Sequence, residues 1–528
     1  MKSTSLSIHF KLSVFLALLF SMGCNAPKSQ KNARETYLEQ HRPQYHFTPD
    51  SMWMNDPNGL VYYDGEYHLF YQHNPDKNVW GPMHWGHAVS EDLVNWDHLP
   101  VALYPDSLGT IFSGSAVIDW NNSSGLQNGD HPPMVAIFTY HNMKIEQCGI
   151  DTFQYQGIAY SNDRGRSWIK YDGNPILRNP GIRDFRDPKV IWFEEGQKWI
   201  MVLAVNDRVY FYSSQNLIDW AWESEFGSHA GAHGGVWECP ELLPLYEDGV
   251  EKWILVVSVS SKSPNGGSGT QYFVGKFDGS DFINENPGKE AMWLDYGRDN
   301  YAGVTFSDIP EDDGRRILVG WMSNWEYAQI VPTGHWRNAM TIPRELHLSY
   351  NGTHYEVFCR PVAELDVLRK DSFEIEATEL SGNLEFKEIQ DYEPSLYEIN
   401  LEFNIADDTK EGRAVEFGFI LANTLDEHIT VGYNILEEFV FIDRTKSGKD
   451  AFSEQFPGLH KAPIAVPANR QLRMKAYIDK ASIELFINDG KRVMTEIFFP
   501  NEDYNRISLY ANNGSVELRS GSVYSLKQ

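Results

Sequence analysis

His87-Ala-Val-Ser-Glu-Asp-Leu-Val-Asn-Trp96 is the first of three related segments that indicate the fold of this chain. The pattern returns in Ile158-Ala-Tyr-Ser-Asn-Asp-Arg-Gly-Arg-Ser-Trp168 and in Phe211-Tyr-Ser-Ser-Gln-Asn-Leu-Ile-Asp-Trp220. Each segment reads as a strand, a turn with Ser-x-Asp or Ser-x-Asn, and a Trp that fills the next core. Their starts are 71 and 53 residues apart, which leaves room for one four-stranded unit each. Repeated units of this size predict a β-propeller, and a β-sandwich with coincidental turns is the alternative.

The surrounding sequence is also typical of an all-β protein. Short apolar runs such as Met134-Val-Ala-Ile-Phe-Thr-Tyr140 and Lys252-Trp-Ile-Leu-Val-Val-Ser258 are separated by Gly, Asn, Asp and Pro. No long stretch shows the apolar period of about 3.6 residues that marks an amphipathic helix. We therefore predict an all-β fold.

Past the last Trp, Trp336, the sequence changes character. Alternating polar and apolar strands such as Tyr397-Glu-Ile-Asn-Leu-Glu-Phe403 become dominant, and Asn488-Asp-Gly490 is a strong hairpin turn. This pattern indicates a second domain built as a β-sandwich. We predict a β-propeller over residues 46–362 and a β-sandwich over residues 373–528.

Residues 1–23 have the features of a signal peptide. Their apolar run, Leu12–Met22, follows two Lys and is too short to span a bilayer permanently. The Cys at position 24 resembles the lipidated Cys of a bacterial lipobox, whereas Ser21-Met-Gly23 also suits ordinary signal peptidase. We expect lipidation of Cys24 and a polar tether over residues 24–45. The protein would then be a cell-envelope lipoprotein rather than a freely secreted one.

The composition excludes several classes of partner. The 528 residues include 45 Lys and Arg against 73 Asp and Glu, a formal charge of −28. Such an acidic surface repels nucleic acid and anionic lipid, so we expect no nucleic-acid partner and no membrane contact except a lipid anchor. The 16 Trp, 27 Tyr and 29 Phe exclude a disordered chain and suit a sugar-binding protein. Cys148, Cys239 and Cys359 are too far apart for a disulfide framework, and we expect buried free thiols.

Three acidic motifs carry the candidate chemistry: Trp53-Met-Asn-Asp-Pro-Asn-Gly59, Phe185-Arg-Asp-Pro-Lys-Val190 and Trp237-Glu-Cys-Pro-Glu-Leu242. The Pro after Asp56 and after Asp187 predicts an extended backbone that fixes the direction of each carboxylate. Any one motif alone is typical of a structural turn. Three of them in separate blades would meet at the central mouth of a propeller, where paired carboxyl groups suit glycoside hydrolysis.

In this order the motifs resemble the signatures of glycoside hydrolase family 32, the fructan hydrolases and invertases, over nearly all of the mature chain. The resemblance implies a five-bladed catalytic propeller followed by a β-sandwich. It implies Asp56 as the nucleophile, Glu238 as the acid/base, and Asp187 as a transition-state stabiliser that holds two ring hydroxyls. It also implies retention of configuration, for which the Asp56 and Glu238 carboxyl groups would lie roughly 5–5.5 Å apart.

Further residues match family positions around the fructose unit. Those expected to hydrogen-bond hydroxyls are Asn55, Gln72, Ser113 and Arg186. Those expected to wall the pocket, because sugar C–H faces stack on aromatic rings, are Trp80, Phe112 and Trp321. No cofactor and no metal are expected, because His84-x-x-His87 and His229-x-x-x-His233 lack a matching third ligand.

The resemblance predicts a retaining hydrolase that releases β-D-fructofuranosyl units from levan or inulin, with sucrose as a further candidate substrate. Three alternatives stay open: an endo-acting enzyme that releases oligosaccharides, a fructosyltransferase, and a non-catalytic fructan-binding lipoprotein. Asp119–Pro133 and Ser261–Gly269 are the loops expected to form the rim of the pocket and to set the linkage preference.

Overall fold

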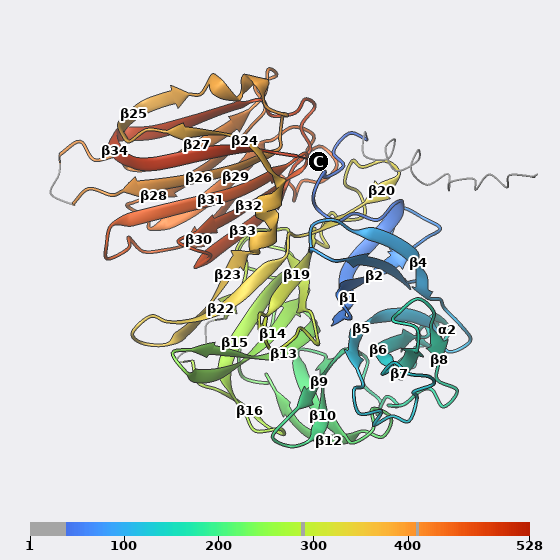
Figure 1. Cartoon of the computed structure of the whole chain (residues 1–528). Coiled ribbons are helices and arrows are strands. Elements are labelled where there is room, and N and C mark those ends of the chain that lie inside the picture. The colour runs from blue at the N-terminus through green and yellow to red at the C-terminus, as the bar shows by residue number, and fades with distance from the viewer. Residues whose placement is uncertain (1–38, 287–290, 408–410, 528) are drawn as a thin grey trace, which may run out of the picture. The chain divides into compact units, whose positions relative to one another are not determined.

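The computed structural model describes residues 39–286, 291–407 and 411–527. The predicted signal peptide, Cys24 and most of the predicted tether lie outside these residues. Within them, five separate sheets are followed by a larger sheet domain, and the predicted all-β class of a five-bladed propeller with a C-terminal β-sandwich is confirmed (Figure 1).

Each propeller sheet is an antiparallel meander of consecutive strands. The first contains β1 (Met52–Tyr63), β2 (Glu66–Asn74), β3 (His84–Ser90) and β4 (Asp97–Leu103). The second contains β5 (Thr110–Ile118), β6 (Met134–His141), β7 (Gln154–Ser161) and β8 (Ile169–Lys170). The third contains β9 (Phe185–Phe193), β10 (Lys198–Val205), β11 (Arg208–Ser214) and β12 (Ala221–Phe226).

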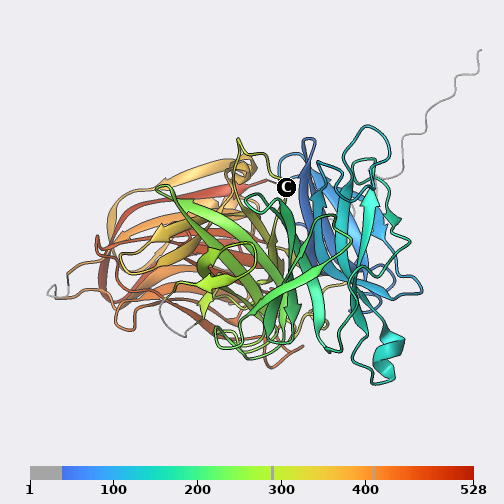
Figure 2. The same ribbon diagram turned by 90° about the horizontal axis from the view of Figure 1, so that it is seen from below.

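The last two sheets carry short additional strands. The fourth contains β13 (Trp237–Glu247), β14 (Val250–Val259), β15 (Gly269–Phe277) and β16 (Phe282–Asn284), with β17 (Met292–Trp293) beside β15. The fifth contains β18 (Tyr301–Thr305), β19 (Ile317–Met322), β22 (Arg344–Tyr350) and β23 (Tyr355–Pro361), with β21 (Ala339–Met340) beside β19. The short helix α2 (Met143–Gln147) lies between β6 and β7 and projects beyond the strands (Figure 2).

The three repeated segments are the connections between the third and fourth strands of the first three sheets. Trp96, Trp168 and Trp220 each donate their indole N–H to the backbone carbonyl three residues earlier, at 3.1–3.2 Å. All three rings are partly buried against a hydrophobic cluster. The repeat is therefore one local structure used three times.

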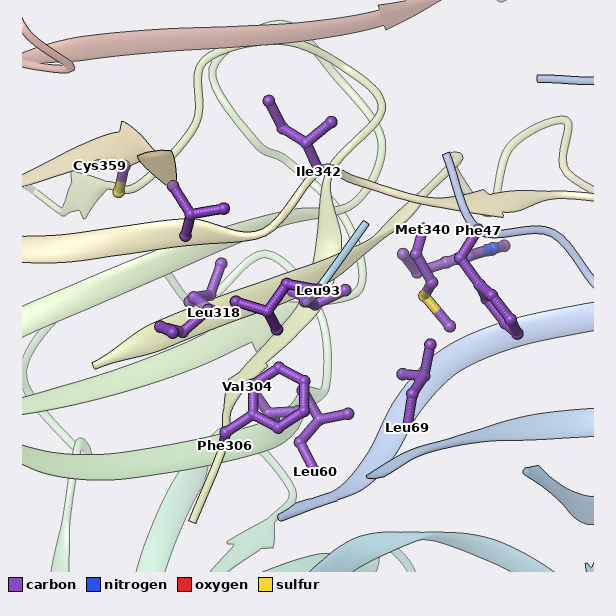
Figure 3. Packing of buried hydrophobic residues seen from close by; sticks show 14 of the residues in the cluster. Phe47, Leu60, Leu69, Leu93, Val304, Phe306, Leu318, Met340, Ile342 and Cys359 are labelled. Atoms are coloured by element: carbon purple, nitrogen blue, oxygen red, sulfur yellow. The ribbon is translucent and has the colours of Figure 1, made fainter. Parts of the chain in front are cut away.

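The ring closes where the first and fifth sheets meet. Strand β20 (Trp336–Arg337) returns from the fifth sheet and pairs in parallel with β1. Leu60 and Leu69 of the first sheet share a buried core with Val304 and Leu318 of the fifth (Figure 3). Burial of apolar side chains is the main favourable term in folding, so this shared core holds the closure together.

The C-terminal domain is organised around β34 (Arg506–Leu526). The first half of β34 pairs with β27 and its second half with β26, so that one strand takes part in both halves of the domain. The other strands are β24 (Arg369–Ile375), β25 (Thr378–Glu385), β26 (Tyr397–Asn404), β27 (Glu416–Ala422), β28 (His428–Asn434), β29 (Phe439–Lys446), β30 (Leu459–Pro463), β31 (Gln471–Asp479), β32 (Ser482–Ile487) and β33 (Arg492–Ile497). Two 3-10 turns, η1 (Ala363–Leu368) and η2 (Glu388–Asp391), complete the elements.

Buried ion pairs join the propeller to the β-sandwich. Arg344 of β22 contacts Asp295 at 2.8 Å and Glu484 of β32, and Arg444 of β29 contacts Asp299 at 2.6 Å. A buried charge is costly unless it is paired, so separating the two domains would leave these charged groups without their partners.

Cys239 and Cys359 are buried as predicted, but Cys148, which follows α2 directly, is exposed, so the prediction for that thiol was wrong. Among the residues described, no helix has the length and apolar character needed to cross a bilayer.

Candidate active site

A β-bulge interrupts each of the five innermost propeller strands near its N-terminal end. These strands, β1, β5, β9, β13 and β18, are the first of their sheets and contact one another around the centre. At a bulge the extra residue is left out of the ladder and its side chain is re-aimed. The residues skipped by the pairing are Asn55-Asp56, Phe112-Ser113, Asp187-Pro188, Cys239-Pro240 and Ala302-Gly303.

The backbone at three of these bulges is strained. Asp187, Cys239 and Ala302 have φ values of 61°, 46° and 54°, in the left-handed region that residues with a Cβ rarely adopt. The prediction of an extended backbone at Asp187 was therefore wrong. The following Pro disfavours the right-handed helical region, and the bulge selects the left-handed region rather than the extended one. Such strain persists only where the surrounding structure enforces it, as at a functional site.

The bulges bring three carboxylates to one cavity of about 430 Å³. Asp56, Asp187 and Glu238 all line this cavity. The Cys239 thiol lies 3.6 Å from Asp56 Oδ2 and 3.8 Å from Asp187 Oδ2, and the backbone N–H of Cys239 donates to Asp187 Oδ2 at 3.1 Å. The two aspartates therefore flank one residue of the strand that carries Glu238.

Asp56 has one hydrogen-bonded and one unpaired carboxylate oxygen. Ser113 Oγ donates a hydrogen bond to Asp56 Oδ2 at 2.7 Å, whereas Oδ1 has no hydrogen-bond partner among the described residues. Burial and the charge of Glu238 raise the pKa of Asp56, and hydrogen bonds from Ser113 and Asn55 oppose that rise. An ionised carboxylate that is oriented through one oxygen and has no hydrogen bond at the other is suited to nucleophilic attack.

Glu238 is held by two donors. Its Oε1 accepts from Arg186 Nη2 at 3.0 Å and Nε at 3.2 Å, and its Oε2 accepts from the Tyr301 hydroxyl. Arg186 Nη1 in turn donates a hydrogen bond to Asp184 Oδ1 at 2.5 Å, which fixes the guanidinium. The Glu238 side chain is 20% exposed, more than that of Asp187 at 5%, so it is the carboxyl group that solvent or a leaving group reaches.

Burial strongly perturbs the Asp187 carboxyl group. Burial raises its pKa to about 7, with further contributions from the charges of Glu238 and Asp56, while Arg186 and the Cys239 N–H act in the opposite direction. Neighbouring acids in a low-dielectric cavity cannot all ionise without cost, and perturbed pKa values such as those of Asp56 and Asp187 mark functional sites.

The structure places six of the seven predicted sugar-contacting residues on the cavity wall, namely Asn55, Gln72, Trp80, Phe112, Ser113 and Arg186. Trp321 differs from the prediction, because it is fully buried in β19 and does not line the cavity. Its ring packs against Trp53 and against Trp325, with ring centroids 6.2 and 4.8 Å apart. Trp325 lies in the turn after β19 and reaches the cavity instead.

Part of the wall was missed in the sequence. His141, Glu146, Phe153, Gln154, Arg183 and Asp184 line it as well. Asp184 could have been found, because it stands in the same Arg-Asp-Phe-Arg-Asp run as Arg186. Glu146 lies on the short helix α2, where no sequence motif marks it.

The two predicted rim loops have different locations. Ser268, in the loop between β14 and β15, accepts a hydrogen bond from the Trp325 backbone N–H at 3.4 Å, so this loop lies beside the cavity. Asp119–Pro133 instead follows the C-terminal end of β5, whose N-terminal part carries Ser113. The prediction that Asp119–Pro133 forms the rim was therefore wrong, because this loop leaves the other end of the channel.

Comparison with known proteins identifies the family. The sequence profile of the glycosyl hydrolases family 32 N-terminal domain matches residues 46–361, and that of the family 32 C-terminal domain matches residues 364–525. The chain belongs to glycosyl hydrolase family 32. This family 32 member is therefore a glycosidase, as predicted.

Relatives of the family 32 chain extend over most of its length. A levanase of Bacillus subtilis (strain 168) is 48% identical over 522 residues, which cover 98% of this chain and 75% of the relative. An extracellular exo-inulinase of Aspergillus awamori is 35% identical, and the match covers 93% of this chain and 95% of the relative. A crystal structure of exo-inulinase from Aspergillus awamori matches with a TM-score of 0.84 and 34% identity, covering 93% of this chain and 99% of that one.

Proposed function

We propose that this family 32 glycosidase releases terminal β-D-fructofuranosyl units from fructans, levan or inulin, and from sucrose, with retention of configuration. The similarity to a levanase and to exo-inulinases supports a fructan as the substrate. The observation that carries the exo-acting form of the proposal is the 35% identity to an extracellular exo-inulinase over 93% of this chain. Below the three carboxylates the channel narrows to a space of about 10 Å³, room for about one water. The cavity is therefore closed toward the interior of the channel, and substrate enters it from the side that faces solvent.

The contacts support a double displacement. Asp56 Oδ1 attacks the anomeric carbon while Glu238 gives its proton to the departing oxygen, which breaks the glycosidic bond and leaves a fructosyl ester on Asp56. Glu238 then takes a proton from water, and the resulting hydroxide attacks the anomeric carbon from the face that the leaving group occupied, opposite Asp56, and displaces the Asp56 carboxylate. Two inversions give net retention. Asp187 accepts hydrogen bonds from two ring hydroxyls and stabilises the positive charge that develops on the ring.

The residues around the acids prepare each step. Ser113 holds Asp56 Oδ2 and leaves Oδ1 for attack. Arg186 and Tyr301 bind both oxygens of Glu238 and so keep the carboxyl group at a fixed orientation. Because these donors are in place before substrate binds, the enzyme spends little free energy on reorganisation.

The products formed early from levan, inulin and sucrose test this proposal. The protein lacking residues 1–24 is incubated with each substrate, and the products are separated by chromatography, with the Asp56→Asn variant as control. Free fructose as the first product of a fructan supports an exo-acting pocket. A ladder of oligosaccharides would identify an endo-acting enzyme, longer chains formed in excess sucrose would identify a transferase, and no product at all would favour a non-catalytic fructan-binding protein.

We propose further that residues 46–362 form the catalytic domain and that the mature chain is a lipoprotein anchored through Cys24 after removal of residues 1–23. The extracellular exo-inulinase among the relatives supports export. Partition of the full chain into detergent, with Cys24→Ser as control, tests the anchor. Equal partition of the two proteins would contradict lipidation.

A further inference from the structure

A second large cavity, of about 530 Å³, lies at the opposite end of the innermost strands. On β9, Asp187 near the N-terminal end lines the active site, whereas Trp192 near the C-terminal end lines the second cavity. On β13, Glu238 near the N-terminal end lines the active site, and Tyr246 near the C-terminal end lines the second cavity. Because each strand runs from one cavity to the other, the two cavities occupy the two ends of the central channel.

A polar plug separates the second cavity from the active site. Lys189 Nζ contacts Glu241 Oε2 at 2.8 Å and donates to the Thr305 carbonyl at 2.9 Å, and the side chains of Lys189 and Glu241 are 5% and 1% exposed. Above these groups lies only the 10 Å³ space in the middle of the channel. A ligand in the second cavity therefore cannot reach the catalytic carboxylates through the channel.

Two exposed aromatic rings stand at the mouth of the second cavity. Trp120 is 57% exposed and Tyr246 is 61% exposed, and both line the cavity. Trp120 lies in the Asp119–Pro133 loop, which the sequence had suggested for a substrate contact at the other end. Large aromatic side chains left this open to solvent are costly and mark interaction sites when they border a cavity.

Four aromatic rings of the cavity donate hydrogen bonds to carboxylates. Trp120 Nε1 donates to Asp308 Oδ1 at 2.8 Å, and Trp192 Nε1 donates to Glu194 Oε2 at 2.7 Å. Glu251 binds two further rings, because Tyr246 Oη donates to its Oε2 at 2.5 Å and Trp253 Nε1 donates to its Oε1 at 3.0 Å. Rings held in place before binding lose little conformational entropy when a ligand stacks on them.

The chemistry of this wall suits a neutral polyol. Ring faces pack against C–H groups, and carboxylate oxygens accept hydrogen bonds from hydroxyls. Glu194, Glu195 and Glu251 would repel an anionic ligand. Arg316 is also on the wall, and Asp308 at its base has a pKa raised to about 6 by burial. Aromatic rings with hydrogen-bonding groups between them therefore match a carbohydrate better than a lipid or a charged metabolite.

We propose that the second cavity is a carbohydrate-binding site, distinct from the active site, that holds a neutral oligosaccharide segment of a fructan through Trp120 and Tyr246. The identity of the polymer rests on the proposed function, whereas the presence of a neutral-sugar site does not. Binding at this end would keep the enzyme on a polymer while chain ends enter the catalytic pocket.

Retardation in native gels that contain levan or inulin tests the site. The parent, in the Asp56→Asn background, is compared with Trp120→Ala, Tyr246→Ala and Trp120→Phe. Trp222→Ala is the matched control, because Trp222 is also 57% exposed but lies on β12 outside the cavity. We expect each Ala variant to weaken retention about tenfold or more, as for a buried aromatic hot spot, and Trp120→Phe to weaken it less. Trp222→Ala should behave as the parent.

Sucrose hydrolysis of the same variants with Asp56 restored reports whether the catalytic pocket is intact. Retention of the Trp120 and Tyr246 variants equal to that of Trp222→Ala would overturn the proposed site. If the parent hydrolyses no fructan but the gels still retard it, and the Trp120 and Tyr246 variants lose that retardation, the sugar-binding site is supported and the proposed function is refuted. The two failures are thus distinguishable.

Discussion

Replacing Ser113 by Ala removes the hydroxyl that holds the Asp56 carboxylate. Ser113 Oγ donates to Asp56 Oδ2 at 2.7 Å and is one of the groups that oppose the rise of the Asp56 pKa caused by burial and by Glu238. The attacking carboxylate must be ionised. Without the hydroxyl its pKa rises further, so the acid limb of the activity profile moves to higher pH.

The size of the effect follows from the strength of the bond. A hydrogen bond to a charged group contributes about 1.5–3 kcal/mol, and about 1.4 kcal/mol corresponds to a tenfold change in rate. We therefore expect kcat/KM for Ser113→Ala to fall about 10- to 100-fold on the acid side of the profile. The deficit should shrink as the pH rises and Asp56 ionises in both proteins.

The assay is kcat/KM for sucrose, or for the better fructan, between pH 4 and pH 8 in buffers of constant ionic strength. Ser115→Ala is the matched control, because Ser115 lies on the same strand and is equally buried, at 4% exposure, but donates to the Pro188 carbonyl. Its profile should keep the parental acid limb. An acid limb unchanged in Ser113→Ala, or a loss of activity equal at every pH, would refute the role assigned to the Ser113 hydrogen bond.

Three further predictions concern the acids and the fold. Asp56→Asn and Glu238→Gln should each lower kcat for sucrose by about a thousandfold or more. Glu238→Gln should lose less activity on an aryl fructoside, because that leaving group needs no proton. Equal losses of activity on both substrates would contradict the role of Glu238 as the acid. Tyr301→Phe removes a donor to Glu238 and should lower kcat/KM about 10- to 100-fold with the melting temperature nearly unchanged, whereas parental activity would show that the contact is dispensable. Although burial lowers the pKa of His46, its hydrogen bonds with Asp479 and Glu484 raise that pKa from 6.5 to about 9. This shift contributes about 3 kcal/mol to the free energy of unfolding. The contribution is fully present below pH 6.5 and is lost as the pH rises through 9. The free energy of unfolding of His46→Gln should therefore approach that of the parent between pH 6.5 and 9, and a difference independent of pH would contradict this linkage.

Local sequence patterns predicted the fold because they encode local structure. The repeated Ser-x-Asp turns and their Trp residues form the same connection in three sheets, and the indole hydrogen bond that stabilises each spans only three residues. The Asp-Pro and Cys-Pro pairs marked three of the five bulges, because Pro within a sheet is confined to edges and bulges. The bulges at Phe112-Ser113 and Ala302-Gly303 carry no Pro, and no bulge was predicted from the sequence.

The parts of the site that the sequence did not predict depend on how distant segments meet. Trp321 and Trp325 are four residues apart and chemically alike, and only the packing of β19 against β18 decides which one reaches the cavity. Glu146 enters the wall because α2 follows the end of β6 beside the second bulge. The location of the Asp119–Pro133 loop depends on the direction of β5 through the channel, which its own residues do not encode.

The stereochemistry of transfer to methanol tests the double displacement through Asp56 most directly. The enzyme is incubated with its preferred substrate in buffer that contains methanol, and the methyl fructoside, which does not mutarotate, is identified by NMR. If a covalent fructosyl intermediate forms on Asp56, methanol attacks the anomeric carbon from the face opposite Asp56, and the product is methyl β-D-fructofuranoside. Formation of the α-anomer would mean a single displacement and would contradict the assignment of Asp56 as nucleophile.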